Sequence, residues 1–165
     1  MPPRLTRLLL AVVAVCSAAC VSSRAQTLPG ECPGNWWQCV YSPQRLVIRE
    51  PCVTVRGVVT DARYALDGDA IVYVRLDPEY AHFSNQRDYE RLGKDMLELE
   101  IVCRHPVLRF FVFRCWTCGS RMRVPRVGDH IEADGIYVQD TRHWHMELHP
   151  VTRITVLSTT DSVPE

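Results

Sequence analysis

The sequence has almost no lysine and no excess of charge of either sign. Lys94 is its one lysine, the basic and acidic side chains number 19 each, and the formal net charge is zero. A protein that binds nucleic acid or anionic lipid nonspecifically needs an excess of basic side chains, because their attraction to phosphate supplies much of that affinity. The sequence therefore does not predict strong binding to nucleic acid or to an anionic membrane.

A long apolar run is also missing. The apolar run near the N-terminus extends from Leu8 to Ala19, whereas a membrane-spanning helix needs about 20 residues. Arg4 and Arg7 precede the run and small residues follow it, which is the layout of a secretory signal peptide. The sequence therefore predicts a signal over 1–25 and a mature chain without a transmembrane helix, in the periplasm or outside the cell.

Two ways of processing this signal are open. A peptidase can cut after Ala25, because Ser23 and Ala25 are a suitable pair of small residues. Alternatively, the chain can be cut before Cys20 and lipidated there, which would give an envelope lipoprotein that acts through protein partners. The soluble product is favoured, because the leucine that usually precedes the small pair of a lipidation site is missing.

The cysteines of the mature chain predict disulfides. Two of the eight cysteines fall inside the signal, and the other six are Cys32, Cys39, Cys52, Cys103, Cys115 and Cys118. An even number in an exported chain favours three disulfides, among roughly 15 connectivities. The pair Cys115 and Cys118 also has the spacing of a redox dithiol or half a zinc knuckle, but the βαβ context and a second such pair are absent. Structural bridges such as Cys103–Cys115 and Cys32–Cys118 are therefore favoured.

Composition divides the mature chain into an arm, one domain and a tail. Residues 26–44 are rich in Pro, Gly, Asn and Trp without a helical or strand period, which predicts an irregular arm tethered by Cys32 and Cys39. Residues 45–157 are enough for one domain with a hydrophobic core. Residues 158–165 form a frayed tail.

The domain is predicted to be all-β. Alternating apolar residues predict strands over 52–64, 70–77, 96–103, 131–138 and 145–157. The segment 107–115 is apolar at nearly every position, so it is either a strand buried on both faces or a segment covered by the arm. Residues 79–95 form a short helix or an ordered loop. About five strands without a long helix favour a small Greek-key barrel of the OB type, which binds oligonucleotides or oligosaccharides in its known examples.

Two glycine-containing stretches refine this prediction. Gly57 lies inside the first strand, which indicates a bulge or a sharp coil. Asp67-Gly68-Asp69 predicts the turn of a hairpin between the first two strands. The same carboxylates can bind calcium, but the later glutamate of a calcium-binding loop is missing, so the turn is favoured.

The chain resembles a family of small exported microbial proteins with a closing signature like D-x-x-H-G-W-x-E-I-H-P-V. The resemblance extends over about Cys39 to Leu157, and its most specific part is the closing stretch 140–151 together with Gly128-Asp129 and Asp67-Gly68-Asp69. The residues that match the signature are Asp140, His143, Glu147, His149 and Pro150. The resemblance implies an OB-like barrel and no particular activity.

The departures from that family concern histidine and cysteine. Trp144 and His145 stand where Gly-Trp is usual, and the stretch 70–72 lacks a histidine that often follows the DGD turn. The resemblance also implies that Cys52, Cys103 and one of the CWTC cysteines belong to the family pattern. It implies that Cys32 and the other CWTC cysteine form an added bridge.

The closing stretch carries the candidate metal ligands, which are Asp140, His143, His145, Glu147 and His149. Alternation along a strand would point the last four of these toward one face. Imidazole and carboxylate suit zinc, iron or manganese, and three such ligands plus water form an open catalytic site. Because same-face neighbours are about 6.5 to 7 Å apart along a strand, only two or three of them can reach one ion.

Two interpretations of this stretch remain open. In the favoured one, Glu147 and His149 bond the backbone of the last hairpin, and His143 and His145 lie at the surface. In the other, the stretch forms the divalent-metal site of a hydrolase, with phosphodiesters as a candidate substrate class. Aromatic residues near the cysteines and turns, such as Trp36 and Trp144, either pack over disulfides, which is favoured, or form a stacking platform for sugars or bases.

No serine triad, phosphate loop, dinucleotide fingerprint or haem-attachment motif is present, so no motif identifies an enzyme. The favoured function is an exported, disulfide-stabilised OB-like binding or structural module of unknown ligand. The metal-dependent hydrolase and the lipoprotein acting through partners are the alternatives.

Overall fold

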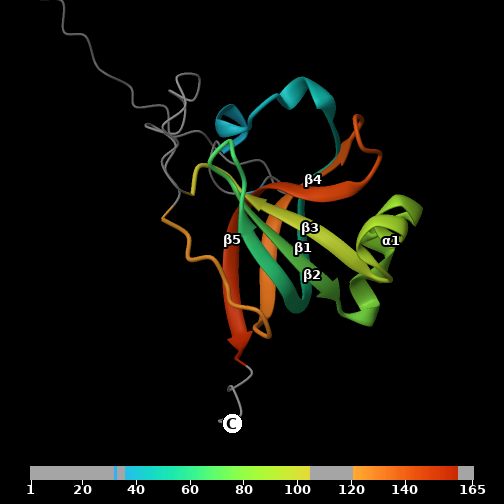
Figure 1. Ribbon diagram of the computed structural model, residues 1–165, viewed down its shortest axis with the longest axis vertical. Coiled ribbons are helices and arrows are strands. Elements are labelled where there is room, and N and C mark those ends of the chain that lie inside the picture. The colour runs from blue at the N-terminus through green and yellow to red at the C-terminus, as the bar shows by residue number, and fades with distance from the viewer. Residues whose placement is uncertain (1–31, 33–35, 105–120, 160–165) are drawn as a thin grey trace, which may run out of the picture.

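The computed structural model describes residue 32 and residues 36–104 and 121–159, which form a mostly β domain. Its five strands are β1 (Leu46–Tyr64), β2 (Ala70–Leu76), β3 (Met96–Ile101), β4 (His130–Asp140) and β5 (Met146–Ser158). They close into a barrel in the order β1-β2-β3-β5-β4 (Figure 1), with β3 and β5 parallel and the other described pairs antiparallel. The prediction of a β-rich domain of about five strands is confirmed.

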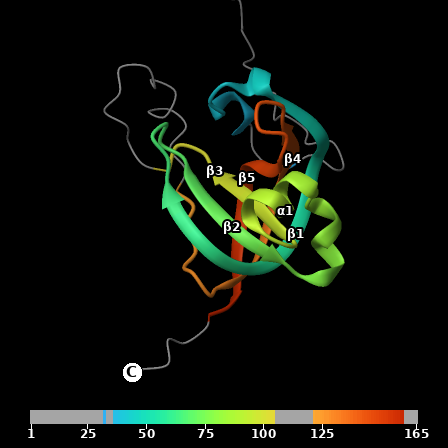
Figure 2. The same ribbon diagram turned by 45° about the vertical axis from the view of Figure 1, so that its right-hand side comes forward.

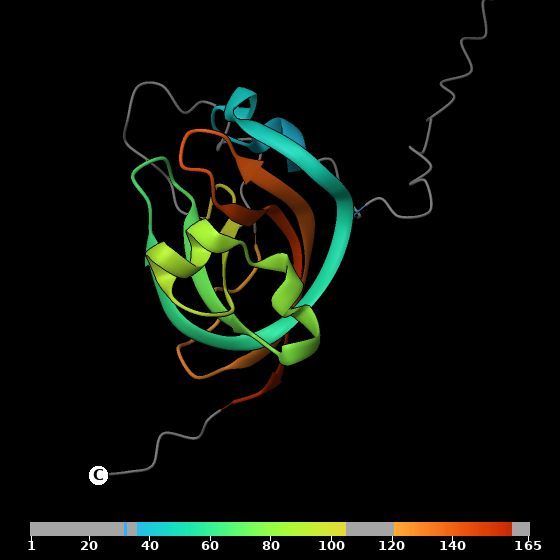
Figure 3. The same ribbon diagram turned by 90° about the vertical axis from the view of Figure 1, so that its right-hand side faces the viewer.

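The first strand is the longest of the five and pairs with a different neighbour along each half. β1 is 19 residues long and curves around the barrel (Figure 3), pairing with β2 through its second half and with β4 through its first. Pairing continues through Gly57 in both ladders, and the register shifts lie elsewhere, for instance between Val59 and Asp61. The prediction for Gly57 was a bulge or a sharp coil, and the two ladders exclude the bulge at this residue. A Cβ atom on Gly57 would overlap the carbonyl oxygen of Arg75, so close approach of β2 explains the glycine.

The core fills the barrel with side chains from all five strands. Alternation along β3 places Leu97, Leu99 and Ile101 in this core, so that Glu98 and Glu100 point to the opposite face. The parallel register pairs Glu98 with Glu147 of β5. All six residues of β3 are buried, so the polar face of this strand is covered as well as the core face.

The connection between β2 and β3 contains the 3-10 segment η3 (Pro78–Phe83) and the short helix α1 (Gln86–Leu92). The Asn85 side chain caps α1, and Asp88 bonds back to the Asn85 N–H, which is a complete capping box. Asp88 also accepts a hydrogen bond from the N–H of Met146 at 3.1 Å. The helix is thereby joined to the first residue of β5.

Two 3-10 segments, η1 (Trp36–Cys39) and η2 (Pro43–Arg45), precede β1. They lie at the same end of the barrel as the β4–β5 turn (Figure 2), and Thr141 of that turn bonds the carbonyl of Arg45 through its N–H at 2.8 Å. Val40 and Leu46 pack there with residues of β4 and of the segment after β3.

Among the described residues, no helix is long and apolar enough to cross a membrane.

The cysteine pairing differs from the predicted example. Cys32 is bonded to Cys52, with a Cα–Cα distance of 4.8 Å. Cys39 and Cys103 each take part in a disulfide as well. A Cys32–Cys118 bridge, and with it the grouping of Cys32 with a CWTC cysteine, is therefore wrong. The physical reason is that β1 begins at Leu46 instead of Cys52, so Cys52 lies inside the strand, where residue 32 reaches it. Residues 1–25, Cys20, the segment 107–115, Cys115, Cys118 and most of the tail lie outside the described residues.

Candidate functional site

Charged side chains gather on the face of β3 and β5 that points away from the core. This buried polar face consists of Glu98, Glu100, His145, Glu147 and His149, whose exposed fractions are 6% or less. Alternation places Glu147 and His149 of β5 on this face, and His145, the residue before β5, joins them, whereas His143 lies in the turn. The favoured prediction that His145 lies at the surface is therefore wrong, because its side chain is buried against the two glutamates of this face that it contacts. Burial of so many ionisable groups is costly unless each finds a partner of opposite charge.

The carboxylate of Glu147 lies between the two buried imidazoles. Its Oε2 is 3.5 Å from Nε2 of His145, and its Oε1 is 3.4 Å from Nδ1 of His149. On the neighbouring strand, Glu98 Oε2 is 3.7 Å from Nε2 of His145, and Glu100 Oε2 is 3.0 Å from Nδ1 of His149. Each histidine therefore faces one carboxylate of β3 and shares that of Glu147.

The group formed by Glu98, His145 and Glu147 has the spacing of a metal site. Ligand atoms of Glu98, His145 and Glu147 all lie within 4.8 Å of one another. Ligands at 2.0 to 2.2 Å from a tetrahedral ion are roughly 3.4 Å apart, close to the measured contacts of Nε2 with the two carboxylates. Neither ring nitrogen of His145 has a hydrogen-bond partner in the described part of the chain, nor has Glu147 Oε2. The imidazole is thus enclosed without its hydrogen bonds.

Arg91 of α1 binds the carboxylate of Glu98 and so competes with a metal ion for it. Its Nη2 lies 2.7 Å from Glu98 Oε2 and about a third of its side chain is exposed. The guanidinium supplies a positive charge at the edge of the polar face. A metal ion bound by Glu98 must therefore share this carboxylate with Arg91 or displace it.

Burial and mutual contact shift the pKa values of these groups. Burial, followed by the nearby charge of Glu100, raises the pKa of Glu98 to about 7. Burial alone would also raise the pKa of Glu147, but its contacts with His145 and His149 lower it. Burial opposes charge on both imidazoles, yet the neighbouring carboxylates raise the pKa of each. The field on this face is therefore negative and attracts protons or other cations.

A pocket of about 200 Å³ opens this face to solvent. Its charged lining comprises the carboxylates Asp67, Glu98, Glu100, Asp140 and Glu147 and the guanidinium groups Arg45 and Arg91, together with His143 and His145. Five carboxylates against two arginines favour a cationic ligand over an anionic one. His149 does not line the pocket and lies deeper, with no exposed surface.

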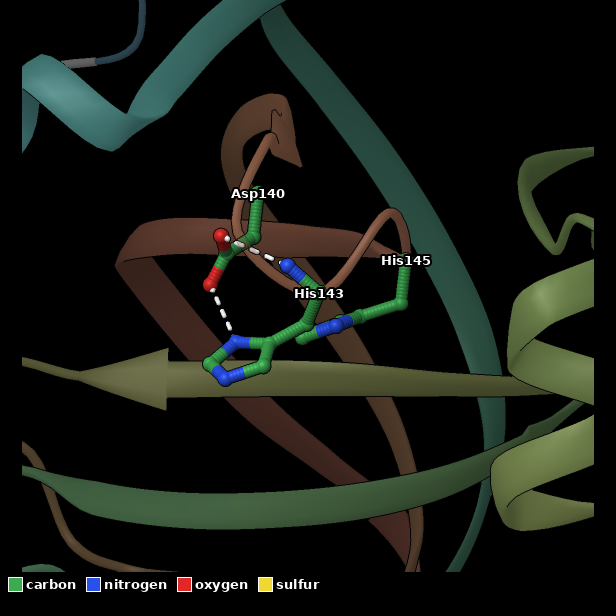
Figure 4. Close-up of side chains that lie close together, drawn as sticks. All are labelled: Asp140, His143 and His145. Atoms are coloured by element: carbon green, nitrogen blue, oxygen red, sulfur yellow. Dashed lines mark hydrogen bonds and ion pairs between the residues drawn. The ribbon is translucent and has the colours of Figure 1, made fainter.

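Asp140 organises the turn at the pocket mouth. Its carboxylate accepts a hydrogen bond from the N–H of Arg142 at 2.7 Å. It also accepts hydrogen bonds from the N–H of His143 and from Nδ1 of the His143 ring at 2.8 Å (Figure 4). Burial would raise the pKa of Asp140, but these bonds and the charge of Arg45 lower it. The carboxylate thus stays ionised and fixes the ring of His143.

The His143 ring is half-exposed and stacks on the ring of His145, with centroids 5.7 Å apart. Ligand atoms of Asp140, His143 and His145 also lie within 4.8 Å of one another. Because the Nδ1 of His143 is held by Asp140, its Nε2 is the nitrogen left for other contacts. The favoured prediction had Glu147 and His149 bonding the backbone of the last hairpin. Their described contacts are with other side chains, and the residue that bonds the backbone of this turn is Asp140.

The sequence did not indicate two of the residues at this site, Glu98 and Glu100. Glu98 and Glu100 come from β3, where a glutamate at every second position of the otherwise apolar stretch 96–101 was the available signal. Asp69 belongs to the predicted hairpin turn, which the β1–β2 pairing confirms, and the sequence offered its carboxylate only as a possible calcium ligand. It is buried and accepts a hydrogen bond from the N–H of Cys103 at 2.6 Å. It lies with Glu100 and His149 in a separate group of close ligand atoms.

Aromatic residues are divided between two environments. Trp36 and Trp37 are half-buried against the small cluster that contains Cys39 and Cys103, in line with packing near disulfides. Trp144 is 57% exposed and has a left-handed backbone conformation in the β4–β5 turn.

No protein-family model matches the chain, and no curated protein matches its sequence. The resemblance to small exported microbial proteins therefore stays a prediction.

Proposed function

We propose that the chain is an exported OB-like binding module that holds a divalent transition-metal ion in its pocket, with Glu98, His145 and Glu147 as ligands. The strand order and the parallel contact between β3 and β5 support the OB assignment. OB barrels bind ligands over strands 2 and 3, between the β1–β2 and β4–β5 loops. The pocket is lined by Ala65 and Asp67 of the first loop and by His143 and His145 of the second.

The observation that carries the proposal is the state of His145. The side chain is 2% exposed, both of its ring nitrogens are without a hydrogen bond in the described part of the chain, and carboxylates lie 3.5 and 3.7 Å from its Nε2. A buried polar group without a partner costs about 1 to 3 kcal/mol. A metal ion among the three ligands would give Nε2 of the imidazole a partner and neutralise the carboxylates.

The donor set restricts the metal. One imidazole and two carboxylates suit zinc, manganese or iron(II), while the absence of thiolate from this set disfavours copper(I). Three protein ligands leave a coordination position open toward the pocket, where a water molecule or a ligand oxygen can bind. The disulfides fit an exported protein, in soluble or lipid-anchored form. Mass spectrometry of the mature N-terminus distinguishes these two forms.

Calorimetric titration of the oxidised protein with zinc and with manganese tests the proposal. We expect saturable binding that is lost in His145→Ala and in Glu98→Gln. The matched controls are His82→Ala and Glu79→Gln, which alter exposed side chains outside the pocket and should leave binding unchanged. Binding that persists in both pocket variants, or no binding by the unaltered protein, would contradict the proposal.

The pair Asp140 and His143 supports a second candidate, a metal-dependent hydrolase. A half-exposed imidazole whose Nδ1 is held by a buried carboxylate is oriented as general bases are in hydrolases. In this function Nε2 of His143 would take the proton of the attacking water molecule, and a metal held by Glu98, His145 and Glu147 would make that water more acidic. Zinc- or manganese-dependent cleavage of bis(4-nitrophenyl) phosphate that is lost in His143→Ala, with metal binding retained, supports the candidate; metal binding without cleavage rejects it.

A further inference from the structure

A second group of ligand atoms lies next to the proposed metal site. Asp69 precedes β2, Glu100 lies on β3 and His149 on β5, and their ligand atoms are all within 4.8 Å of one another. All three residues are buried, with exposed fractions of 2%, 6% and 0%. Three segments that are far apart in the sequence therefore bring two carboxylates and an imidazole to one point.

Two polar atoms of this group are without partners. Asp69 Oδ2 and His149 Nε2 have no hydrogen bond to any described residue, although both side chains are more than nine-tenths buried. The other oxygen of Asp69 accepts the N–H of Cys103, and the other nitrogen of His149 faces Glu100 at 3.0 Å. Asp69 is thus held at one oxygen and has no described partner at the other, whereas the contacts of His149 with Glu100 and Glu147 are both made by Nδ1, the nitrogen available to an ion in this group.

Glu147 connects this group to the first one. Its Oε2 faces Nε2 of His145 at 3.5 Å, and its Oε1 faces Nδ1 of His149 at 3.4 Å. One carboxylate that reaches two imidazoles can bridge two metal ions, which lie about 3.5 to 4 Å apart in known two-metal sites.

We propose that Asp69, Glu100 and His149 bind a second divalent transition-metal ion, and that the Glu147 carboxylate bridges it to the ion at Glu98 and His145. The bridge rests on the proposed function, whereas the second group stands on its own geometry. Each ion then has one imidazole, at least one carboxylate of its own and one oxygen of Glu147.

Charge on this face favours bound cations. The two groups together contain four carboxylates, Asp69, Glu98, Glu100 and Glu147, and two imidazoles, and the guanidinium of Arg91 pairs with Glu98. When the imidazoles are neutral, three negative charges are left that Arg91 does not balance, in a medium of low polarity, and divalent ions would balance them. Protons on the carboxylates and imidazoles are the competing way to lower this charge, and they predict that no second ion binds.

Metal stoichiometry tests the proposal on the full oxidised chain. After equilibration with manganese or zinc, elemental analysis should find two equivalents in the unaltered protein and one in each of Asp69→Asn and His145→Ala. Asp61→Asn, an exposed carboxylate on β1, is the matched control and should retain two. With manganese, the electron paramagnetic resonance spectrum of the unaltered protein should also show the exchange coupling of two close metal ions. This measurement needs no variant.

The outcomes separate this proposal from the first one. One equivalent that disappears in His145→Ala and persists in Asp69→Asn overturns the second ion and leaves the proposed function intact. One equivalent with the opposite pattern overturns the proposed site at His145 and supports the site at Asp69, Glu100 and His149, without a bridge. Two equivalents without an exchange-coupled spectrum overturn the bridge through Glu147, and an absence of bound metal overturns both proposals.

Discussion

Glu147 Oε2 lies 3.5 Å from Nε2 of His145, and both side chains are almost completely buried. The contact is a direct result of strand alternation, which places side chains two positions apart on the same face. The parallel pairing with β3 then brings Glu98 to the same imidazole at 3.7 Å. Two local relationships, one along a strand and one across a ladder, thus assemble a three-ligand group.

Glu147→Gln tests whether this contact serves stability alone or a bound metal. In the metal-free protein, we expect a loss of about 3 kcal/mol in the free energy of unfolding, because the variant leaves the imidazoles without the carboxylate they share. Saturating zinc should raise the melting temperature of the unaltered protein and should not raise that of the variant. Urea and thermal unfolding with and without zinc measure both effects, with Glu79→Gln as the control. An unaltered protein whose melting temperature ignores zinc would indicate a purely structural role.

The stability of the metal-free protein should fall as the pH rises. Burial raises the pKa of Glu98 and of Asp69 to about 7, so the folded state holds these protons more tightly than the unfolded state does. Their contribution to stability is therefore complete below the unfolded pKa, near 4, and is lost as the pH rises through about 7. The pKa values of His145 and His149 are also raised, so their contribution is lost above about 6.5.

Glu147 acts in the opposite direction, but in another pH range. Its pKa is lowered, so the stability it contributes is present above its unfolded pKa, about 4.5, and is lost only in more acidic solution. Urea unfolding in a chelating buffer should therefore give a smaller free energy at pH 8 than at pH 5. Zinc should reverse this trend, because protons and metal compete for the same ligands. A free energy that rises with pH in the chelating buffer would contradict the prediction.

Two glycines of the barrel should differ in their tolerance of a side chain. A Cβ on Gly57 overlaps the backbone of Arg75, whereas a Cβ on Gly135 approaches the carbonyl oxygen of Pro150 at 3.0 Å, where small shifts can relieve it. Gly57→Ala should therefore cost about 3 kcal/mol or more and Gly135→Ala about 1 kcal/mol. Urea unfolding of the two variants, compared with the unaltered protein, checks the order. Equal losses would show that β2 can move away from Gly57.

The disulfide between Cys32 and Cys52 should contribute substantially to stability. It closes a loop across 20 positions of sequence, and a bridge over a loop of this size contributes about 3 kcal/mol by restricting the unfolded chain. The double variant Cys32→Ser and Cys52→Ser should unfold at correspondingly lower urea concentration. Thiol titration of the unfolded, unreduced protein provides the control, since an unaltered protein with six free thiols would have no bridge to lose.

Sequence periodicity was sufficient for the strands and insufficient for the complete site. The alternation in 70–76 and 96–101 predicts β2 and β3 because each strand contributes its own apolar face to the core. The start of β1 was missed because the segment 47–51 is exposed on both faces and carries no pattern. Glu98 reaches His145 through a parallel pairing between strands that are distant in sequence, and no local pattern encodes such a pairing.

Arg91 provides the last test, because it binds the carboxylate that the proposed metal requires. Its Nη2 lies 2.7 Å from Glu98 Oε2, and its positive charge also repels a cation in the pocket. Arg91→Gln should therefore bind zinc more tightly than the unaltered protein, by about three- to tenfold, which corresponds to roughly 0.7 to 1.4 kcal/mol for a partly exposed ion pair.

Arg87→Gln is the matched control for this test. Arg87 lies on the same helix and pairs with Glu90 at 3.0 Å, with both side chains largely exposed. Its removal changes the net charge by the same amount without freeing a carboxylate of the pocket, so zinc affinity should stay within a factor of about two. Calorimetric titration at one pH and ionic strength compares the three proteins. A zinc affinity that falls in Arg91→Gln would mean that Arg91 positions Glu98 for the metal instead of competing with it.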